Sequence, residues 1–230
     1  MYSLCMLLNL LFPKFCIFCK TFGKNICNNC RKKVVLCTNN KCTICNRPTI
    51  LGLNHEWCKG ELDGVFCIFE YKTPIKEIIK TIKYNLAFSL WKETLDLIPN
   101  TTISQIKNFK NDIGEVNIQP IPLHTQRLKQ RGFNQVEPFA SFISKQLQSP
   151  LVHMLKRRTN TTSQVSVKEK TKRAQNIEDA FYIPSYIDIK KQKFILIDDV
   201  FTTGNTCIEA AKTLKKKGAE KVYALTLAKD

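Results

Sequence analysis

Two adjacent carboxylates, Asp198 and Asp199, follow an apolar run at residues 194–197 and precede a turn of small polar residues. A short continuous apolar run is typical of a parallel strand covered on both faces, and open α/β sheets bind ligands at the carboxyl ends of such strands. Ionised carboxylates only accept hydrogen bonds, so the pair suits donors such as sugar hydroxyls. The turn consists of Thr202, Thr203, Gly204, Asn205 and Thr206. Its hydroxyls and backbone N–H groups at the start of a helix suit a phosphate, so we expect a sugar phosphate as ligand.

The order of these residues resembles the 5-phosphoribosyl-1-pyrophosphate (PRPP) loop of type I phosphoribosyltransferases, in which an apolar strand, two acids and a Thr-Thr-Gly-x-Thr turn follow one another. The resemblance implies that Asp198 and Asp199 hold the 2′ and 3′ hydroxyls of the ribose. It also implies that residues 202–206 hold the 5′-phosphate. An ordinary strand-to-helix turn, with Asp at the strand end and Thr as helix N-cap, is the alternative. That alternative does not require both acids together with every small residue of the turn.

A second cluster holds three cations within five positions, Arg127, Lys129 and Arg131, beside an expected loop. Residues two apart on a helix diverge by about 200°, so the three side chains cannot share one helical face. At least some of them must point into a site or to solvent. A doubly charged leaving group such as pyrophosphate suits the bidentate guanidinium groups of Arg127 and Arg131.

The N-terminal quarter of the chain carries eight possible metal ligands, arranged as four pairs with two residues inside each pair. They are Cys16, Cys19, Cys27, Cys30, Cys42, Cys45, His55 and Cys58. Tight turns that present two thiolates are the geometry of zinc ribbons, in Cys₄ and Cys₃His versions. A disulfide framework is the alternative, but it requires an oxidising compartment and the chain has no recognisable export signal. The spacing predicts two structural zinc sites and leaves open which pairs combine.

The motif Pro-Leu-x-x-x-Arg-x-x-x-Arg-Gly-Phe-Asn-Gln at residues 122–135 lies between the cysteine-rich segment and the PRPP loop. This combination is similar to the ComF (ComFC) family of competence-associated phosphoribosyltransferase-like proteins. The resemblance spans nearly the whole chain. It departs from the family at His55, where cysteine is expected in many relatives, although imidazole also binds zinc.

The family resemblance implies a cytoplasmic protein that handles incoming single-stranded DNA in natural transformation, with a helicase or DNA-channel partner. The inner face of the membrane is a further possible location. For the site, it implies PRPP or another phosphoribosyl ligand held by Leu123, His124 and Arg127 as well as by the loop at 198–206. Mg²⁺ is expected to bridge pyrophosphate and ribose oxygens. Asp198, Asp199, Arg127 and Arg131 are the residues we expect to carry any catalysis.

A polar, basic segment between the two clusters resembles the flexible hood that closes over PRPP in related transferases. Its candidate residues are Lys156, Arg157, Arg158, Gln164, Lys168 and Arg173. A lid of this kind excludes water and protects a reactive ribosyl centre from hydrolysis. A plain solvated loop is the alternative.

The chain is strongly basic, with 36 Lys and Arg residues against 19 acidic residues and a formal net charge of +17. Such an excess suggests a polyanionic partner, for which single-stranded DNA is the natural candidate. The alternative is compositional bias, in which lysines such as those at 215–217 only solvate helices. No run of 18 apolar residues occurs, so no transmembrane helix is expected. Residues 1–12 are apolar without signal-peptide features and suggest a capping helix or a short anchor.

The remaining pattern predicts an α/β fold with a parallel sheet of roughly five strands and helices on both faces. Strands are expected at 63–71, 116–121, 194–197 and 222–227, and helices at 75–82, 89–97 and 206–217. Residues 99–115 are expected to be a loop or a peripheral helix. Structural zinc supplies about 10–16 kcal/mol in small modules. We therefore expect a double zinc ribbon at 1–61 and a type I phosphoribosyltransferase-like domain at 62–230.

No residue stands out as a base for an acceptor substrate, which leaves two hypotheses. The chain is either a PRPP-binding module of a competence protein or an active phosphoribosyltransferase. An enzyme of nucleotide salvage or metabolism without a DNA role is the alternative function, although it leaves the ribbons without a purpose.

Overall fold

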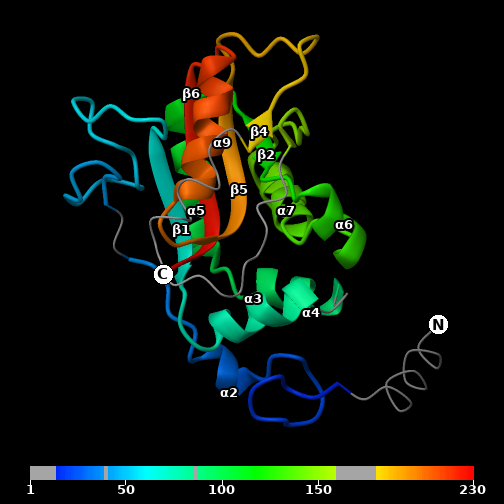
Figure 1. Ribbon diagram of the computed structural model, residues 1–230. Coiled ribbons are helices and arrows are strands. Elements are labelled where there is room, and N and C mark those ends of the chain that lie inside the picture. The colour runs from blue at the N-terminus through cyan, green and yellow to red at the C-terminus, as the bar shows by residue number, and fades with distance from the viewer. Residues whose placement is uncertain (1–13, 39–40, 85–87, 159–179) are drawn as a thin grey trace, which may run out of the picture.

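The central sheet has four parallel strands in the order β1-β6-β5-β2 (Figure 1). The strands are β1 (Gly64–Glu70), β2 (Asn117–Pro120), β5 (Lys193–Phe201) and β6 (Lys221–Lys229). The structure, a computed structural model, describes residues 14–38, 41–84, 88–158 and 180–230. All four expected strand positions are confirmed, and beyond β2 Leu151 forms an isolated parallel bridge with Ile118, in keeping with the expected sheet of roughly five strands. A separate antiparallel pair joins β3 (Lys156–Arg157) to β4 (Phe181–Tyr182).

Helices form at the three positions where they were expected, 75–82, 89–97 and 206–217, and those at 125–131 and 137–147 were not predicted. The main helices are α3 (Ile75–Tyr84), α4 (Phe88–Leu95), α5 (Asn100–Ile113), α6 (Thr125–Arg131), α7 (Glu137–Leu147) and α9 (Asn205–Lys216), and a single turn, α2 (Asn28–Arg31), lies in the N-terminal region. Within the described part of the chain, none of the helices has the length and apolar character needed to cross a membrane.

Helices cover both faces of the sheet, as predicted. Ile195 and Ile197 of β5 belong to the core that contains α5 and α7, whereas Phe194 and Leu196 belong to the core under α9. Figure 1 shows α9 on one side of the sheet and α5 and α7 on the other. Because both faces are covered, residues 194–197 are fully buried, which accounts for their continuous apolar run.

The polar stretch at 99–115 is a core helix and not the loop or peripheral helix that was expected. Ile106, Phe109 and Ile113 of α5 are buried, and the Phe109 ring meets Tyr223 of β6 edge-on at 5.2 Å between centroids. These apolar residues recur at i, i+3 and i+7, which is a helical stripe. The many Asn and Lys residues between them make the segment polar on average, so its composition alone does not indicate a buried helix.

The first ribbon packs on α4. The carboxylate of Glu93 accepts hydrogen bonds from the backbone N–H of Ile26 and the side-chain amide of Asn25, both at 2.9 Å. Arg31 donates to the backbone carbonyl of Asp96 at 2.8 Å. These contacts fix the ribbon beside the helix that follows α3.

The segment between the two ribbons completes the edge of the sheet at β1. Leu36 forms an antiparallel bridge with Phe69, the Cys37 N–H donates to the Ile68 carbonyl, and the Glu70 N–H donates to the Val35 carbonyl. An exposed strand edge invites pairing with other chains, and this segment covers it.

The second ribbon ends directly against the start of β1. The Val65 N–H donates to the Gly52 carbonyl at 2.8 Å, and Leu53 bridges Gly64. Gly52 has φ +75° and lies so close to the Val65 carbonyl that a side chain there would collide with backbone. Only glycine fits this approach, so the second ribbon is held tightly on β1.

Asp63 ties together three elements at this junction. Its carboxylate accepts the Val222 N–H at 2.9 Å and pairs with Lys215 of α9 at 2.9 Å and with Lys221 of β6 at 3.1 Å. The Asp63 side chain is 16% exposed, so these contacts are only partly screened by water.

We predict that Asp63→Asn lowers the free energy of unfolding by about 1–2 kcal/mol, because two partly buried ion pairs lose their negative charge. Glu115→Gln is the matched control, since Glu115 pairs with Lys110 at 3.5 Å and is 89% exposed. Its expected effect is below about 0.5 kcal/mol. Urea unfolding followed by circular dichroism measures both, and equal effects would contradict the role assigned to Asp63.

Candidate functional site

The expected site residues meet where β2 ends beside β5, near the carboxyl end of that strand. Pro120 of β2 lies opposite Ile197 of β5, and the Ile121 N–H donates to the Ile197 carbonyl at 2.9 Å. Asp198 and Asp199 follow on β5, and the 122–135 motif leaves from β2. The sheet therefore places the carboxylate pair and the cationic segment at the same edge, as expected for parallel strands.

Asp199 is buried and already has partners. Lys83 of α3 lies 3.1 Å from its Oδ1, and Gln135 donates to its Oδ2 at 3.0 Å. Arg131 donates to the Oε1 of Gln135 at 2.9 Å. The expected residue Arg131 thus reaches the carboxylate pair through Gln135, and two opposite charges and an amide stabilise a carboxylate that burial alone would disfavour.

Asp198 lies beside it with less compensation. Burial, and then the charge of Asp199, raise the pKa of Asp198 to about 7, although the Asp199 N–H donates to its Oδ1 at 2.8 Å and Lys83 and Arg157 favour the ionised form. A carboxyl group with this pKa is partly protonated at neutral pH. The two acids therefore differ: Asp199 is a neutralised, buried carboxylate and Asp198 is the more reactive hydrogen-bonding partner.

Arg157 belongs to the site more closely than to a mobile hood. It lies on β3 with its guanidinium 5.3 Å from the centre of the Phe181 ring. Burial and then the nearby charge of Arg127 lower the pKa of Arg157, whereas Asp198 raises it. These interactions place Arg127, Arg157 and Asp198 in one neighbourhood.

The other expected hood residues divide into two groups. Lys156 and Arg158 are exposed, and Arg158 lies over the Tyr182 ring at 4.8 Å. Gln164, Lys168 and Arg173 lie outside the described residues. The pair β3 and β4 flanks that segment, with the Arg158 N–H donating to the Ala180 carbonyl at 2.8 Å.

The cationic segment is a short helix, α6, and not the loop that was expected. His124 caps it, because its Nδ1 accepts the Gln126 N–H at 3.1 Å. Lys129 is exposed, whereas Arg127 and Arg131 are partly buried, so the three cations diverge as the sequence predicts. Leu123, just before the cap, is also partly buried.

The turn at 202–206 prepares the start of α9 for an anion. Gly204, with φ +75°, is the N-cap and supplies no side chain to the first-turn N–H groups. A Cβ at Gly204 would lie 2.4 Å from the Phe201 ring, so only glycine fits there. Thr202 and Thr203 are exposed beside it. The geometry suits a phosphate at the N-terminus of a helix of 12 residues.

The eight expected metal ligands form two separate sets of four. Cys16, Cys19, Cys27 and Cys30 make the first set, and Cys42, Cys45, His55 and Cys58 make the second, with all ligand atoms of a set within 4.8 Å of one another. Neighbouring pairs therefore combine, and the cross-paired alternative is wrong. The side chain of His55 presents its Nδ1 to this set, 3.4 Å from the Cys45 sulfur, and its ring stacks on Trp57.

The donor sets fit zinc better than disulfides. The sulfurs of Cys19 and Cys27 are 3.4 Å apart, far longer than the roughly 2.05 Å of a disulfide bond. Hydrogen bonding with Thr21 lowers the pKa of Cys19 to about 6, whereas burial and the Cys27 side chain raise the pKa of Cys30 to about 12. Four thiols at this spacing cannot all ionise unless a cation joins them, which is the role of a structural zinc ion.

Sequence reasoning did not single out Lys83 or the role of Gln135, and it assigned Arg157 to the hood without its position on β3 near Asp198. Gln135 lies inside the 122–135 motif, so its position was visible although its role was not. Lys83 follows the apolar stripe of α3, and only the packing of that helix against the strand ends shows that its ammonium reaches Asp199. No local sequence pattern predicts the contact between Lys83 and Asp199.

Comparison with known protein families assigns both parts of the chain. Residues 7–61 match the double zinc ribbon domain, and residues 136–230 match the phosphoribosyl transferase domain. The two matches cover the metal clusters and the PRPP-type loop. With the four-ligand sets, they support structural zinc in the N-terminal region.

Relatives along most of the chain are competence proteins. Competence protein ComFC of Streptococcus pneumoniae is 30% identical over 207 residues, which cover 89% of this chain and 81% of that protein. Competence protein F of Haemophilus influenzae is 26% identical over 222 residues, 88% of this chain and 96% of its own. DNA utilization protein YhgH of Escherichia coli is 24% identical over 163 residues, 70% of this chain and 69% of its own. This chain therefore belongs to the ComF (ComFC) family of competence-related, phosphoribosyltransferase-like proteins.

Proposed function

We propose that the chain binds PRPP, or a closely related phosphoribosyl ligand, together with Mg²⁺, and that it serves the handling of single-stranded DNA. One observation carries the proposal: the Asp198–Asp199 pair lies near the carboxyl end of β5, which Phe201 completes, and the turn at 202–206 and the start of α9 follow directly. Sugar hydroxyls and a 5′-phosphate are separated by a few bonds in such a ligand. The two halves of the site lie within one short segment of chain to match them.

The carboxylates can hold the ribose without losing their present partners. A carboxylate has about four lone-pair positions, so Asp199 can accept a hydroxyl in addition to Lys83 and Gln135. Asp198 is free of an ion pair within 4 Å among the described residues and offers its second oxygen. Lys83 keeps the pair from repelling an anionic ligand.

Arginines supply the positive charge for the pyrophosphate end. Arg127 and Arg157 lie near Asp198, and Arg131 is held by Gln135. Guanidinium groups bind phosphate oxygens through two parallel hydrogen bonds, so they suit a departing pyrophosphate. Mg²⁺, when bound, would neutralise phosphate charge, and carboxylates with phosphate oxygens are the ligands it prefers.

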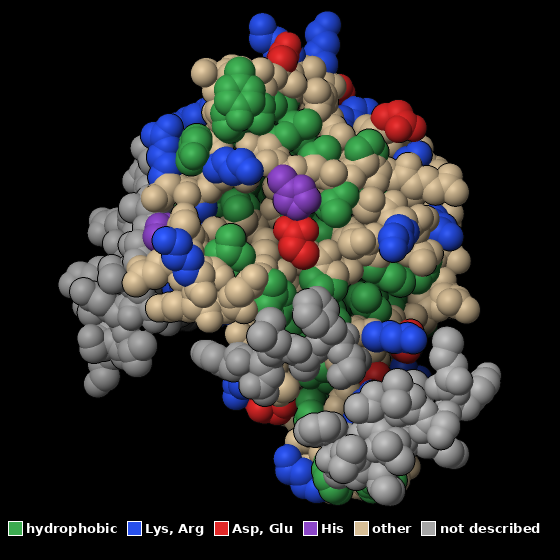
Figure 2. Space-filling view, turned by 90° about the vertical axis from the view of Figure 1, so that its right-hand side faces the viewer, with side chains coloured by type: hydrophobic (Ala, Val, Ile, Leu, Met, Phe, Trp, Pro, Cys, Tyr) green, Lys and Arg blue, Asp and Glu red, His purple; other side chains and the backbone are tan. Residues whose placement is uncertain are grey.

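A DNA role is supported by the relatives and by charge. The Escherichia coli relative is named a DNA utilization protein, and this chain has a formal net charge of +17. On the face shown in Figure 2, Lys and Arg side chains are spread among hydrophobic and uncharged ones. Single-stranded DNA, a helicase or channel partner and a place at the cytoplasmic side of the membrane form one consistent proposal.

We also propose that the ribbons, residues 1–61, form a unit that depends on zinc, and that residues 62–230 form the phosphoribosyl-binding unit. Among residues 14–38 and 41–61, few apolar side chains other than cysteines are buried, with Ile26 the clearest case. Metal binding therefore has to supply most of the stability of the ribbons. The alternative function, an enzyme of nucleotide metabolism without DNA, gives this unit no role.

Titration with PRPP and Mg²⁺ tests the site. Asp198→Asn should weaken binding by about 10- to 100-fold, because a hydrogen-bond acceptor for the ribose loses its charge. Asp112→Asn, at an exposed residue of α5, is the matched control and should change affinity less than twofold. Pyrophosphate release with candidate bases or DNA, lost in Asp198→Asn, indicates catalysis; tight binding without release indicates a binding module. Absence of any binding by the unaltered protein contradicts the proposal.

The raised pKa of Asp198 predicts a pH-dependent effect on stability. The folded protein holds this proton up to about pH 7, whereas the unfolded chain releases it near pH 4, so the stabilising contribution is lost as pH rises through 7. Relative to the unaltered protein, Asp198→Asn should gain about 1–3 kcal/mol of unfolding free energy between pH 5 and pH 8. Thermal unfolding at both pH values measures the difference, and a gain independent of pH would show that Asp198 is not the group responsible.

Metal content tests the ribbons. The purified protein should hold two zinc ions per chain, Cys27→Ser and Cys58→Ser should each reduce this to one, and Cys37→Ser should retain both because Cys37 belongs to neither set. Removal of zinc by a chelator should destabilise the fold. Mass spectrometry that found disulfides in place of metal would overturn the assignment.

A further inference from the structure

A cavity of about 240 Å³ lies between the second zinc ribbon and the turn that follows β5. The ribbon contributes Lys41, Thr43 and Asn46 to its wall. Thr202 and Thr203 of the turn form another part of the wall, and Lys229 of β6 enters from the end of the sheet. The cavity therefore shares two residues with the proposed 5′-phosphate site and lies on the ribbon side of it.

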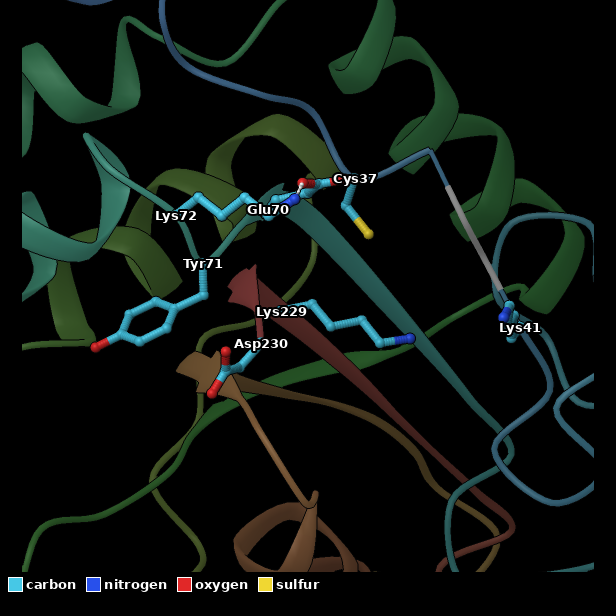
Figure 3. Close-up of a pocket in the computed structure, with 7 residues that line it drawn as sticks. All are labelled: Cys37, Lys41, Glu70, Tyr71, Lys72, Lys229 and Asp230. Carbon is cyan, nitrogen blue, oxygen red and sulfur yellow. Dashed lines mark ion pairs between the residues drawn. The ribbon is translucent and has the colours of Figure 1, made fainter.

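A second cavity of about 300 Å³ adjoins the first and shares Cys37, Lys41 and Lys229 with it. Figure 3 shows the Lys229 side chain extending in the direction of Lys41, with Cys37 above Lys229 in this view. At the far end, Lys72 is paired with Glu70 at 2.7 Å. Together the cavities form a path that leads from the turn, past both lysines, to the edge of β1.

The first cavity is suited to an anion. Among the described residues that line it, the only ionisable groups besides thiols are the ammonium groups of Lys41 and Lys229, and no carboxylate is present. Three hydroxyl or amide side chains in the wall can act as hydrogen-bond donors, Asn46, Thr202 and Thr203, whereas the Thr43 hydroxyl donates to the Asn54 Oδ1 at 3.0 Å. Two ammonium groups with several neutral donors and no acid form a phosphate-binding environment.

The position of this second anion site limits what the ligand can be. A free sugar phosphate ends at its 5′-phosphate, which the turn at 202–206 already accommodates. A nucleotide within a strand continues from that phosphate to the next nucleotide on its 5′ side. The carboxylates, in contrast, require hydroxyls that are not esterified. A ligand that has a free hydroxyl at Asp198 and continues beyond its 5′-phosphate is a nucleotide at the 3′ end of a strand.

We propose that the cavity between the second ribbon and the 202–206 turn binds the penultimate phosphate of a nucleic-acid strand, whose 3′-terminal nucleotide occupies the phosphoribosyl site. The proposal rests on the proposed function of that site and specifies its ligand. The second ribbon then has a direct task, because it supplies Lys41 and Asn46 to the strand. The two parts of the chain act on one ligand.

The test compares two single-stranded 12-nucleotide DNAs with a fluorophore at the 5′ end, one with a 3′-hydroxyl and one with a 3′-phosphate. Fluorescence anisotropy should show at least about tenfold tighter binding of the 3′-hydroxyl strand, because the carboxylates repel a terminal phosphate. PRPP should displace this strand. Equal affinities for both ends would overturn the proposal, as would a failure of PRPP to displace the strand at concentrations that saturate the protein's own PRPP binding.

The lysines are tested by the double variant Lys41→Gln and Lys229→Gln. It should bind the 3′-hydroxyl strand roughly tenfold more weakly and reduce the salt dependence of log affinity by about 0.7 per lysine. Its affinity for PRPP should stay within twofold. Lys107→Gln with Lys190→Gln removes the same charge from two exposed residues elsewhere and should have a smaller effect. Zinc content and the thermal unfolding midpoint verify that the variants fold.

The outcomes separate this inference from the proposed function. Loss of strand and PRPP affinity together in the lysine variant would make the cavity part of the sugar-phosphate site and would overturn the inference alone. An effect equal to that of the control variant would do the same. Lysine-dependent binding of the 3′-hydroxyl strand by a protein that does not bind PRPP would support the cavity and contradict the proposed PRPP function. A different result is that the binding of nucleoside 5′-diphosphates requires the two lysines while the binding of the strand does not. That result would assign the cavity to free nucleotides and overturn the inference.

Discussion

A buried negative charge organises the site. Asp199 sits at the end of the central strand with almost no access to water, so its carboxylate needs compensation from the protein. Lys83 from α3, Gln135 from the segment before α7, and Arg131 behind Gln135 supply it. Three segments that are far apart in the chain are thus fixed by one charge.

The same arrangement leaves the negative charge of Asp198 with fewer compensating groups than that of Asp199. The two acids therefore differ in how readily they ionise. Burial, and then the charge of Asp199 that one lysine cannot offset for both acids, raise the pKa of Asp198 to about 7. Active and binding sites commonly retain an ionisable group whose charged form is destabilised, because a bound ligand stabilises that form. Hydroxyl donors or a cation at Asp198 would do so here.

The zinc ribbons contribute to the phosphoribosyl unit through backbone pairing. Residues 35–37 cover the edge of β1, and Gly52 brings the second ribbon against Val65. The clusters therefore hold Lys41 and its neighbours beside the 202–206 turn. In this way, the metal ligands of the second ribbon, which are far from the carboxylates in the sequence, position part of the wall of a cavity near them.

Much of the fold and the centre of the site could be predicted from sequence, because their signals are local. A few neighbouring residues are enough to predict the geometry of the apolar run before Asp198, of the Thr-Gly turn and of the paired cysteines. The strands and α3 follow from apolar pattern, whereas α5 escaped because polar residues dilute its stripe. Lys83 could not be predicted, since its contact with Asp199 arises only when α3 packs near the end of β5, and the sequence named Arg157 without indicating its place near Asp198. The pairing of the cysteine knuckles likewise needed three-dimensional proximity.

A crystal structure of the protein with PRPP and Mg²⁺ tests the central claim most directly. The account predicts ribose hydroxyls within hydrogen-bond distance of Asp198 and Asp199, the 5′-phosphate on residues 202–206, and Lys83 still beside Asp199. Ligand density elsewhere, with the carboxylate pair in contact only with protein groups, would contradict it.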